Sequence, residues 1–177
     1  ALGITDDSSD EIVTRAHFAD VYARANNIYE KDYESSTPFS DTDSSEYADS
    51  IELLHDCGIL SGVGDNLFVP EGYIMTRDVA RLYVTALGLN TYSQIFGNDY
   101  METAYTIGLF DGVTVSDYIT MNNLILMTYN FLKSPVGFIE FSGMQKYAYT
   151  VDNDTDFLYE KFNILMVTGR VTQNELT

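Results

Sequence analysis

The sequence predicts a mainly helical fold of packed helix-loop-helix repeats. One pattern carries this prediction: a Thr followed by apolar residues at helical spacing recurs at Thr14, Thr76 and Thr120. A Gly-aliphatic step and a loop precede each Thr, and the loop length varies between copies, as it does in surface loops. Because the apolar face of each unit is too small to bury alone, the units are expected to pack around a pseudo-threefold axis.

Five helices are predicted in chain order. Hydrophobic spacing places them over residues 14–28, 44–57, 76–88, 98–107 and 120–133. The second helix is expected to start at an Asp43 N-cap, with Glu46 three residues on, and to end at Gly58. The fifth helix is apolar on nearly all sides and is expected to be the most buried. Any strands are expected to be short.

The repeats divide the chain into a long first part and a shorter extension. Residues 1–133 are predicted to hold a partial copy over 1–30, a full copy over 39–89 and a third copy over 95–133. The first copy is expected to be truncated, because "ALGIT" is typical of the last turn of a helix. Residues 134–177 are predicted to be an extension or the start of another domain.

The extension is predicted to contain strands and one helix near residues 156–163. Asp152, Asp154 and Asp156 alternate as ligands do in a calcium loop. Phe157 and Asn163 stand where that loop needs Gly and Glu, so a solvated turn is the favoured interpretation.

Composition excludes several classes of partner. The net charge of −18 argues against nucleic acid and anionic membranes, which both need basic surfaces. No apolar run is long enough to span a bilayer, so membrane insertion is not expected. Cys57 is the single cysteine of the sequence, so an intrachain disulfide is excluded. We expect it to be a small buried side chain.

Catalytic chemistry, a cofactor and a metal site are not expected. His17 and His55 lack metal-ligand spacing, and the chain has no Ser-His-Asp or Gly-rich phosphate motif. Paired carboxylates for glycoside hydrolysis remain an alternative, although so acidic a chain supplies such pairs by chance.

An arginine follows the Thr in two of the three repeats, as Arg15 and Arg77. A cation in the first turn of a helix is disfavoured by the helix dipole. It becomes favourable as half of an anion site, in which a carboxylate meets the helix N-terminus, the Thr N-cap and the guanidinium. The alternatives are a structural ion pair, or packing of the side-chain stem with an exposed charge.

The second copy carries further motifs in a fixed order. They are Phe39 and Asp41, Tyr47-Ala48, Gly58-Ile59, Gly62, Phe68-Val69-Pro70 and Thr76-Arg77-Asp78. This order resembles the S-layer homology domain, a bacterial cell-surface module usually found as three tandem copies. The first copy keeps Thr14-Arg15-Ala16, with His17 where Glu is usual. In the third, Tyr100, Gly108-Leu109, Gly112 and Thr120 fit, but Met121 replaces the Arg.

The resemblance implies a non-catalytic module that binds secondary cell-wall polysaccharide through a pyruvylated sugar, in grooves between copies. It implies an extracellular location in the cell wall or surface layer, with other surface-layer proteins as a further class of partner. The alternative is a degenerate protein–protein assembly module that no longer binds glycan.

The resemblance also suggests which residues bind the polysaccharide. They are Arg77, Arg15, Thr76, Thr14, Asp41, Tyr47 and Gly62. Arg77 is expected to be the centre of the site, with Asp41, Tyr47 and Gly62 as neighbours, and Arg15 is second. For Tyr47 the alternative is core packing, and for Gly62 and Gly112 it is a turn with positive φ.

Overall fold

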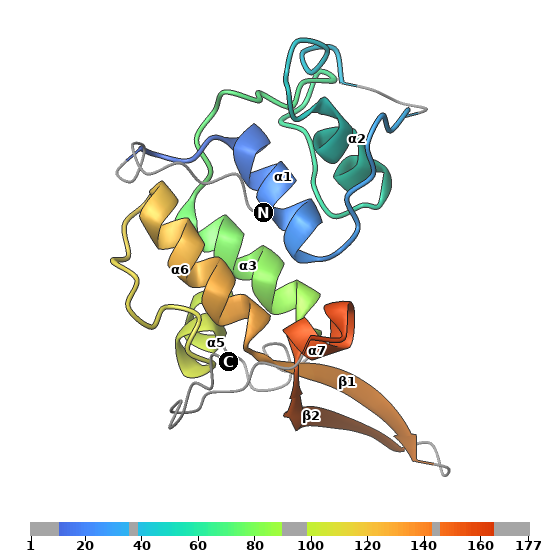
Figure 1. Cartoon of the computed structure of the whole chain (residues 1–177), viewed down its shortest axis with the longest axis vertical. Helices are drawn as coiled ribbons and strands as arrows, with labels where there is room; N and C mark the ends of the chain where they lie inside the picture. The colour runs from blue at the N-terminus through green and yellow to red at the C-terminus, as the bar shows by residue number, and fades with distance from the viewer. Residues whose placement is uncertain (1–10, 36–38, 90–98, 143–145, 165–177) are drawn as a thin grey trace, which may run out of the picture.

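The computed structural model describes residues 11–35, 39–89, 99–142 and 146–164, and these residues form a mainly helical fold, as predicted (Figure 1). All five predicted helices are present within a few residues of their expected bounds. The elements are α1 (Arg15–Ala25), α2 (Ala48–Asp56), α3 (Thr76–Ala86), α5 (Tyr100–Thr106), α6 (Met121–Leu132), β1 (Pro135–Ser142), β2 (Lys146–Asp156) and α7 (Phe157–Phe162). The first ten residues, where the truncated start of copy one was expected, lie outside the described ranges.

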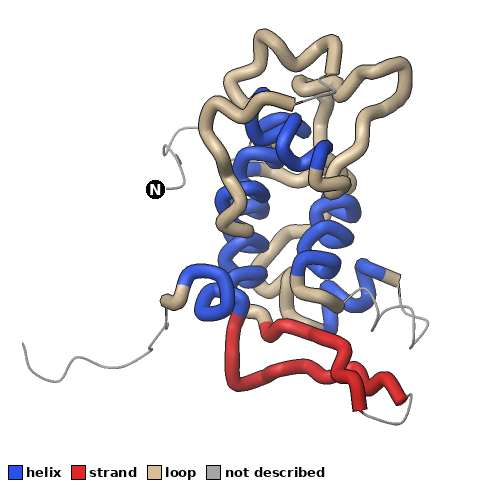
Figure 2. The backbone as a smooth tube through the Cα atoms, turned by 90° about the vertical axis from the view of Figure 1, so that its right-hand side faces the viewer, coloured by secondary structure: helices blue, strands red, loops and turns tan. Residues whose placement is uncertain are grey.

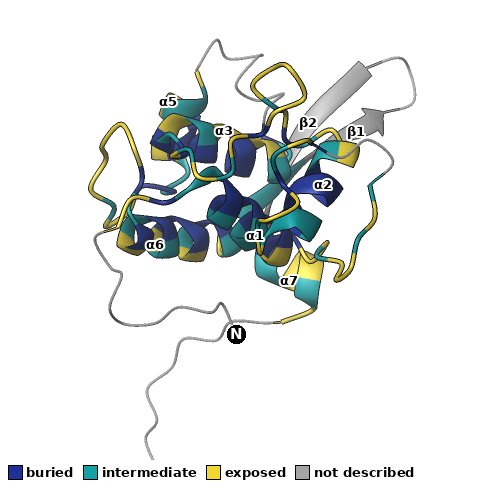
Figure 3. Cartoon of the chain, turned by 90° about the horizontal axis from the view of Figure 1, so that it is seen from above, coloured by how far each residue is buried: buried dark blue, intermediate teal, exposed yellow. Residues whose placement is uncertain are grey.

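The helices pack around one aromatic core. Helices α3 and α6 lie in the middle of the molecule, α2 packs against α1, and α5 packs against α3 (Figure 1). The fully buried ring of Tyr83 stacks on Tyr22 and Phe131, with ring centroids 5.9 Å and 4.3 Å apart. Seen from above, the buried residues lie mostly on the helices, and the exposed ones lie mostly in the loops (Figure 3). The apolar stripes found in the sequence are therefore the faces that the helices bury.

The segments just before α1, α3 and α6 are joined in a closed ring. Three isolated β-bridges join them: Ile12 with Thr120, Thr14 with Tyr73 and Met75 with Tyr118. First-turn amides reinforce them: Arg15 N donates to Gly72 O (2.7 Å), Thr76 N to Asp117 O (2.9 Å) and Met121 N to Glu11 O (2.9 Å). The start of each helix thus contacts a loop that belongs to the next unit. The pseudo-threefold symmetry of the repeats themselves stays a prediction.

The extension forms an antiparallel hairpin followed by a short helix, which confirms the predicted strands and helix. Strands β1 and β2 project away from the helices (Figure 2). Asp156 caps α7 by accepting from Tyr159 N (2.8 Å), and buried Phe157 packs on Phe131 with centroids 4.4 Å apart. The acidic stretch belongs to β2, so the predicted solvated turn is wrong.

The expected start of the second helix is also wrong. Helix α2 begins at Ala48 with Tyr47 as N-cap, because Ser45 N donates to Thr42 O (2.8 Å) and the chain after Asp43 turns instead of winding. Its end is as predicted, since Gly58 has φ +69°.

Two expectations about burial fail. Cys57, the C-cap of α2, is exposed, because it lies at the helix end and not on its inner face. Helix α6 is not the most buried helix, because five of its 12 residues are buried against six of 11 in α1 and in α3, and Leu126 and Tyr129 are 40% and 47% exposed. In the part of the chain that the structure describes, no helix is long and apolar enough to cross a membrane.

Candidate functional site

At the α1 head, residues 14–17, the backbone amides of the first turn bond to other parts of the chain. Thr14 is the N-cap, as predicted, and its Oγ1 accepts from His17 N (3.2 Å). Arg15 N and Ala16 N donate to Gly72 O (2.7 Å) and Pro70 O (3.1 Å). The amides of the first three residues of α1 are therefore all bonded, and none is left for an anion.

The side chain of Arg15 is held by the loop of the second unit. Its Nε donates to Phe68 O (3.0 Å), its Nη2 donates to Ser61 O (3.1 Å), and its guanidinium lies 4.5 Å from the centre of the Phe68 ring. Burial lowers the pKa of Arg15, and the carboxylates of Asp78 and Asp41 oppose that shift. Among the described residues it forms no ion pair, so the cation is fixed by carbonyls and an aromatic face.

Asp41 shapes the loop that holds Arg15. Its carboxylate accepts from Phe68 N (2.9 Å) and Val69 N (2.8 Å). Val69 has φ +61°, a strained conformation for a β-branched residue, and these bonds help to keep it there. Buried Glu52 supports the same turn, since its Oε1 accepts from Phe39 N (3.0 Å) and Thr42 Oγ1 (2.5 Å).

Gly62 and Tyr47 also lie beside α1. A Cβ on Gly62 would approach Leu67 O to 2.5 Å and the Phe39 ring to 2.6 Å, while its φ is not positive. The expected positive-φ turn is therefore wrong for Gly62, although it is confirmed for Gly112 at φ +76°. The ring of Tyr47 stacks on His17 at 5.2 Å, and burial, then the bond to Glu46, raises its pKa to about 12.

These contacts correct the expected grouping of the site. Asp41, Tyr47 and Gly62 were expected beside Arg77, but they contact the α1 head and the loop around Arg15. The reason is the ring of helix starts. Each start contacts the following unit, so the loop of the second unit encloses the first helix and not its own.

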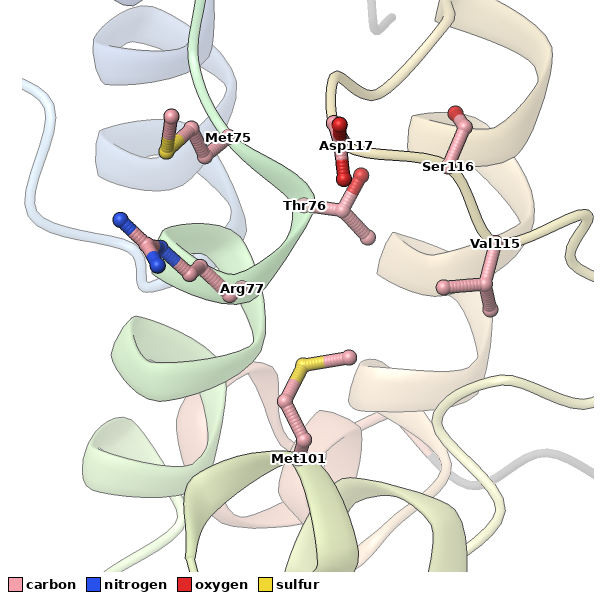
Figure 4. A pocket seen from close by; sticks show the side chains of 7 residues that line it. All are labelled: Met75, Thr76, Arg77, Met101, Val115, Ser116 and Asp117. Atoms are coloured by element: carbon pink, nitrogen blue, oxygen red, sulfur yellow. The ribbon is translucent and has the colours of Figure 1, made fainter.

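The α3 head, residues 75–78, borders a cavity of about 520 Å³. Thr76 is the first residue of α3 and not its N-cap, which is Met75. The Thr76 side chain is buried, and in the described part of the chain its Oγ1 has no hydrogen-bond partner. Figure 4 shows that this hydroxyl points toward Asp117. The cavity is lined by Met75, Thr76, Arg77, Met101, Val115, Ser116 and Asp117.

Arg77 stands free at the rim of this cavity. Its side chain is exposed, and it makes no hydrogen bond or ion pair with the residues that the structure describes. In Figure 4 its guanidinium points away from Val115 and Ser116. The α3 head therefore offers a free cation, a buried free hydroxyl and an apolar wall formed by Met75, Met101 and Val115.

Sequence reasoning missed the far wall of this cavity. Ser116 and Asp117 precede Thr120 in the third unit, and Met101 lies on α5. No signal in the sequence marks these residues, because the loop that meets each helix start is set by contacts between units.

The third helix start offers less chemistry. Thr120 is the N-cap of α6, but its hydroxyl makes no capping bond. Met121, which replaces the Arg, is buried. No group of three or more His, Cys, Asp or Glu residues within the described ranges could hold a metal ion.

One family model matches part of the chain. The family model of the S-layer homology domain matches residues 38–74, about a fifth of the chain and most of the predicted second copy. Such domains are generally non-catalytic modules that anchor proteins at the cell surface by binding secondary cell-wall polymer. No curated protein matches the chain significantly. The match includes Asp41, Tyr47 and Gly62 but neither head arginine, and the first and third copies stay predictions.

Proposed function

We propose that this chain is a non-catalytic module that anchors a bacterial surface or surface-layer protein by binding the pyruvylated sugar of secondary cell-wall polysaccharide at the α3 head. One observation carries the proposal. The Thr76 hydroxyl is buried without a partner in the described chain and faces a cavity at a helix start. A buried polar atom without a partner costs about 1–3 kcal/mol, which a ligand that bonds to it recovers.

The lining of the cavity suits the chemistry of a pyruvyl ketal, which carries a carboxylate and a methyl group on the same carbon. Arg77 and the Thr76 hydroxyl donate to the carboxylate, and Met75, Met101 and Val115 accommodate the methyl group. Asp117 accepts from a sugar hydroxyl. Arg77 must rotate toward the cavity to bind, and its guanidinium has no hydrogen bond or ion pair among the described residues to break first.

Arg15 has a different part in this proposal. Its amide and guanidinium already bond to the loop of the second unit, so it fixes the packing of α1 and is at most a secondary contact for glycan. The proposal therefore keeps Arg77 as the centre of the site.

Titration with purified pyruvylated wall fragments tests the proposal. Loss of a charge-assisted bond in Arg77→Gln is expected to lower affinity about tenfold to a hundredfold. The matched control is Arg81→Gln, one turn further along α3, which makes the same change in net charge and should bind as the parent does. Met121→Ala should also bind normally. Equal binding by Arg77→Gln and Arg81→Gln would contradict the assignment, and release of sugar from the fragments would contradict a non-catalytic role.

The second candidate is a protein–protein assembly module that has lost glycan binding. The closed α1 head favours it, since one of the two arginine-bearing starts has no first-turn amide left for a ligand. A pull-down with purified wall polysaccharide separates the two functions. An assembly module stays in the supernatant, whereas an anchoring module sediments with the polymer.

A further inference from the structure

Two exposed tyrosines lie next to the cavity at the α3 head. Tyr73 is 56% exposed and Tyr118 is 39% exposed, although their rings contact each other edge to face, with centroids 6.0 Å apart. Exposed tyrosines that pack edge to face leave apolar ring surface in water beside two polar hydroxyl groups.

The backbone that carries these rings is well fixed. The bridges of Thr14 with Tyr73 and of Met75 with Tyr118 hold both segments in the ring of helix starts. Tyr118 O also accepts from Ser116 Oγ (2.6 Å). The tyrosines are thus presented on paired backbone, which reduces the entropy lost when a ligand packs on them.

The tyrosine pair continues the two walls of the cavity. Alternate residues of an extended segment point to the same side, so Tyr73 shares a side with Met75. Tyr118 directly follows Asp117, which lines the cavity. Met75 and Ser116 line the cavity, while Ile74 and Ile119 between the tyrosines and their helices are buried. Two residues of extended chain span about 7 Å, which is close to the length of one sugar ring and its linkage.

We propose that Tyr73 and Tyr118 form a second subsite, on which the neutral sugar next to the pyruvylated one stacks its C–H face. This inference rests on the proposed function and adds to it that the module recognises at least two consecutive sugars. A charge argument supports it. With a net charge of −18, the protein repels an acidic polymer. Away from Arg77, contacts that do not depend on charge are therefore expected to contribute most to affinity.

Fragments of different length test the subsite. Tyr73→Ala and Tyr118→Ala are each expected to lower affinity for a wall-derived oligosaccharide about threefold to tenfold, as loss of an aromatic contact does. Neither should change affinity for the single pyruvylated sugar, which fills the cavity alone. Tyr→Phe at either position should keep parental affinity, because the ring remains. Tyr159→Ala on α7, where a tyrosine is 45% exposed, is the matched control and should have no effect.

The salt dependence of binding gives a second readout. The loss in the tyrosine variants should be the same in low and high salt, whereas the loss in Arg77→Gln should shrink as salt screens the charge. If Arg77→Gln weakens binding and the tyrosine variants bind the oligosaccharide as the parent does, the subsite is wrong and the anchoring function stands. An equal loss for the single sugar also overturns the subsite, because the tyrosines would then shape the cavity itself. If the parent binds no wall fragment, both proposals fail.

Discussion

The α1 head and the α3 head begin with the same Thr-Arg pair, yet the chain around them treats the two arginines differently. At α1, the loop over residues 68–72 bonds to the first-turn amides, and Arg15 bonds to Phe68 O and Ser61 O. At α3, Arg77 has no partner among the described residues, and a cavity takes the place of the loop. The comparison teaches that one motif serves packing at the first start and is left available for a ligand at the second.

The difference comes from the loop that meets each helix. The loop facing α1 carries Phe68 and a Val69 in the left-handed region, both fixed by Asp41, and it folds over the arginine. The segment facing α3 runs past it through Val115, Ser116 and Asp117. From this segment the first turn of α3 receives one backbone hydrogen bond among the described residues, from Thr76 N to Asp117 O (2.9 Å). Four changes test this contrast, from the largest expected effect on stability to the smallest.

Asp41→Ala is expected to have the largest effect. It removes the acceptor of two amides and frees Val69 from its strained conformation, and the unfolding free energy should fall by about 3 kcal/mol. Asp43→Ala, an exposed neighbour, is the matched control and should stay within about 0.5 kcal/mol of the parent in urea unfolding. Equal unfolding midpoints for the two variants would show that Asp41 does not organise the loop.

A methyl group on Gly62 should destabilise the same loop next most. In Gly62→Ala the Cβ meets Leu67 O and the Phe39 ring, and we expect a loss of about 2 kcal/mol. Gly112→Ala adds a Cβ in open space at φ +76°, which should cost about 1 kcal/mol. Chemical unfolding of both variants measures the difference, and a larger loss for Gly112→Ala would contradict the close approach at Gly62.

Replacing Arg15 should lower stability more than replacing Arg77, whereas replacing Arg77 should lower glycan affinity more than replacing Arg15. Arg15→Gln loses two bonds to carbonyls and the contact with Phe68, and should cost about 1.5 kcal/mol. Arg77→Gln loses no hydrogen bond or ion pair with the described residues and should stay within about 0.5 kcal/mol of the parent. Thermal unfolding at equal protein concentration compares them. Equal losses would mean that Arg77 is also structural.

The sequence predicts the helices well and the site less well, for a physical reason. Helix positions follow from local spacing, which is why all five predicted helices are found. The partners of Arg15 and Arg77 depend on contacts between units, and nothing in the motif itself shows which loop folds over which helix. Asp41 belongs to the motif of the second copy but acts on the helix of the first, so proximity in sequence misassigned it.

The buried Thr76 hydroxyl lowers the stability of the free protein, because it has no hydrogen-bond partner among the described residues. Its removal is the last of the four changes and the only one expected to raise stability. Thr76→Val replaces a buried hydroxyl without a partner by a methyl group of similar size, so the unfolding free energy should rise by about 1 kcal/mol. The same change removes a donor to the ligand carboxylate, so affinity for the pyruvylated sugar should fall about fivefold to tenfold.

Thr14→Val is the matched control. Its hydroxyl caps α1 by accepting from His17 N, so that variant should lose about 1 kcal/mol and keep its affinity. A gain in stability with unchanged binding would separate the buried hydroxyl from the ligand site, whereas a gain paired with weaker binding is the outcome expected of a group kept for function at a cost in stability.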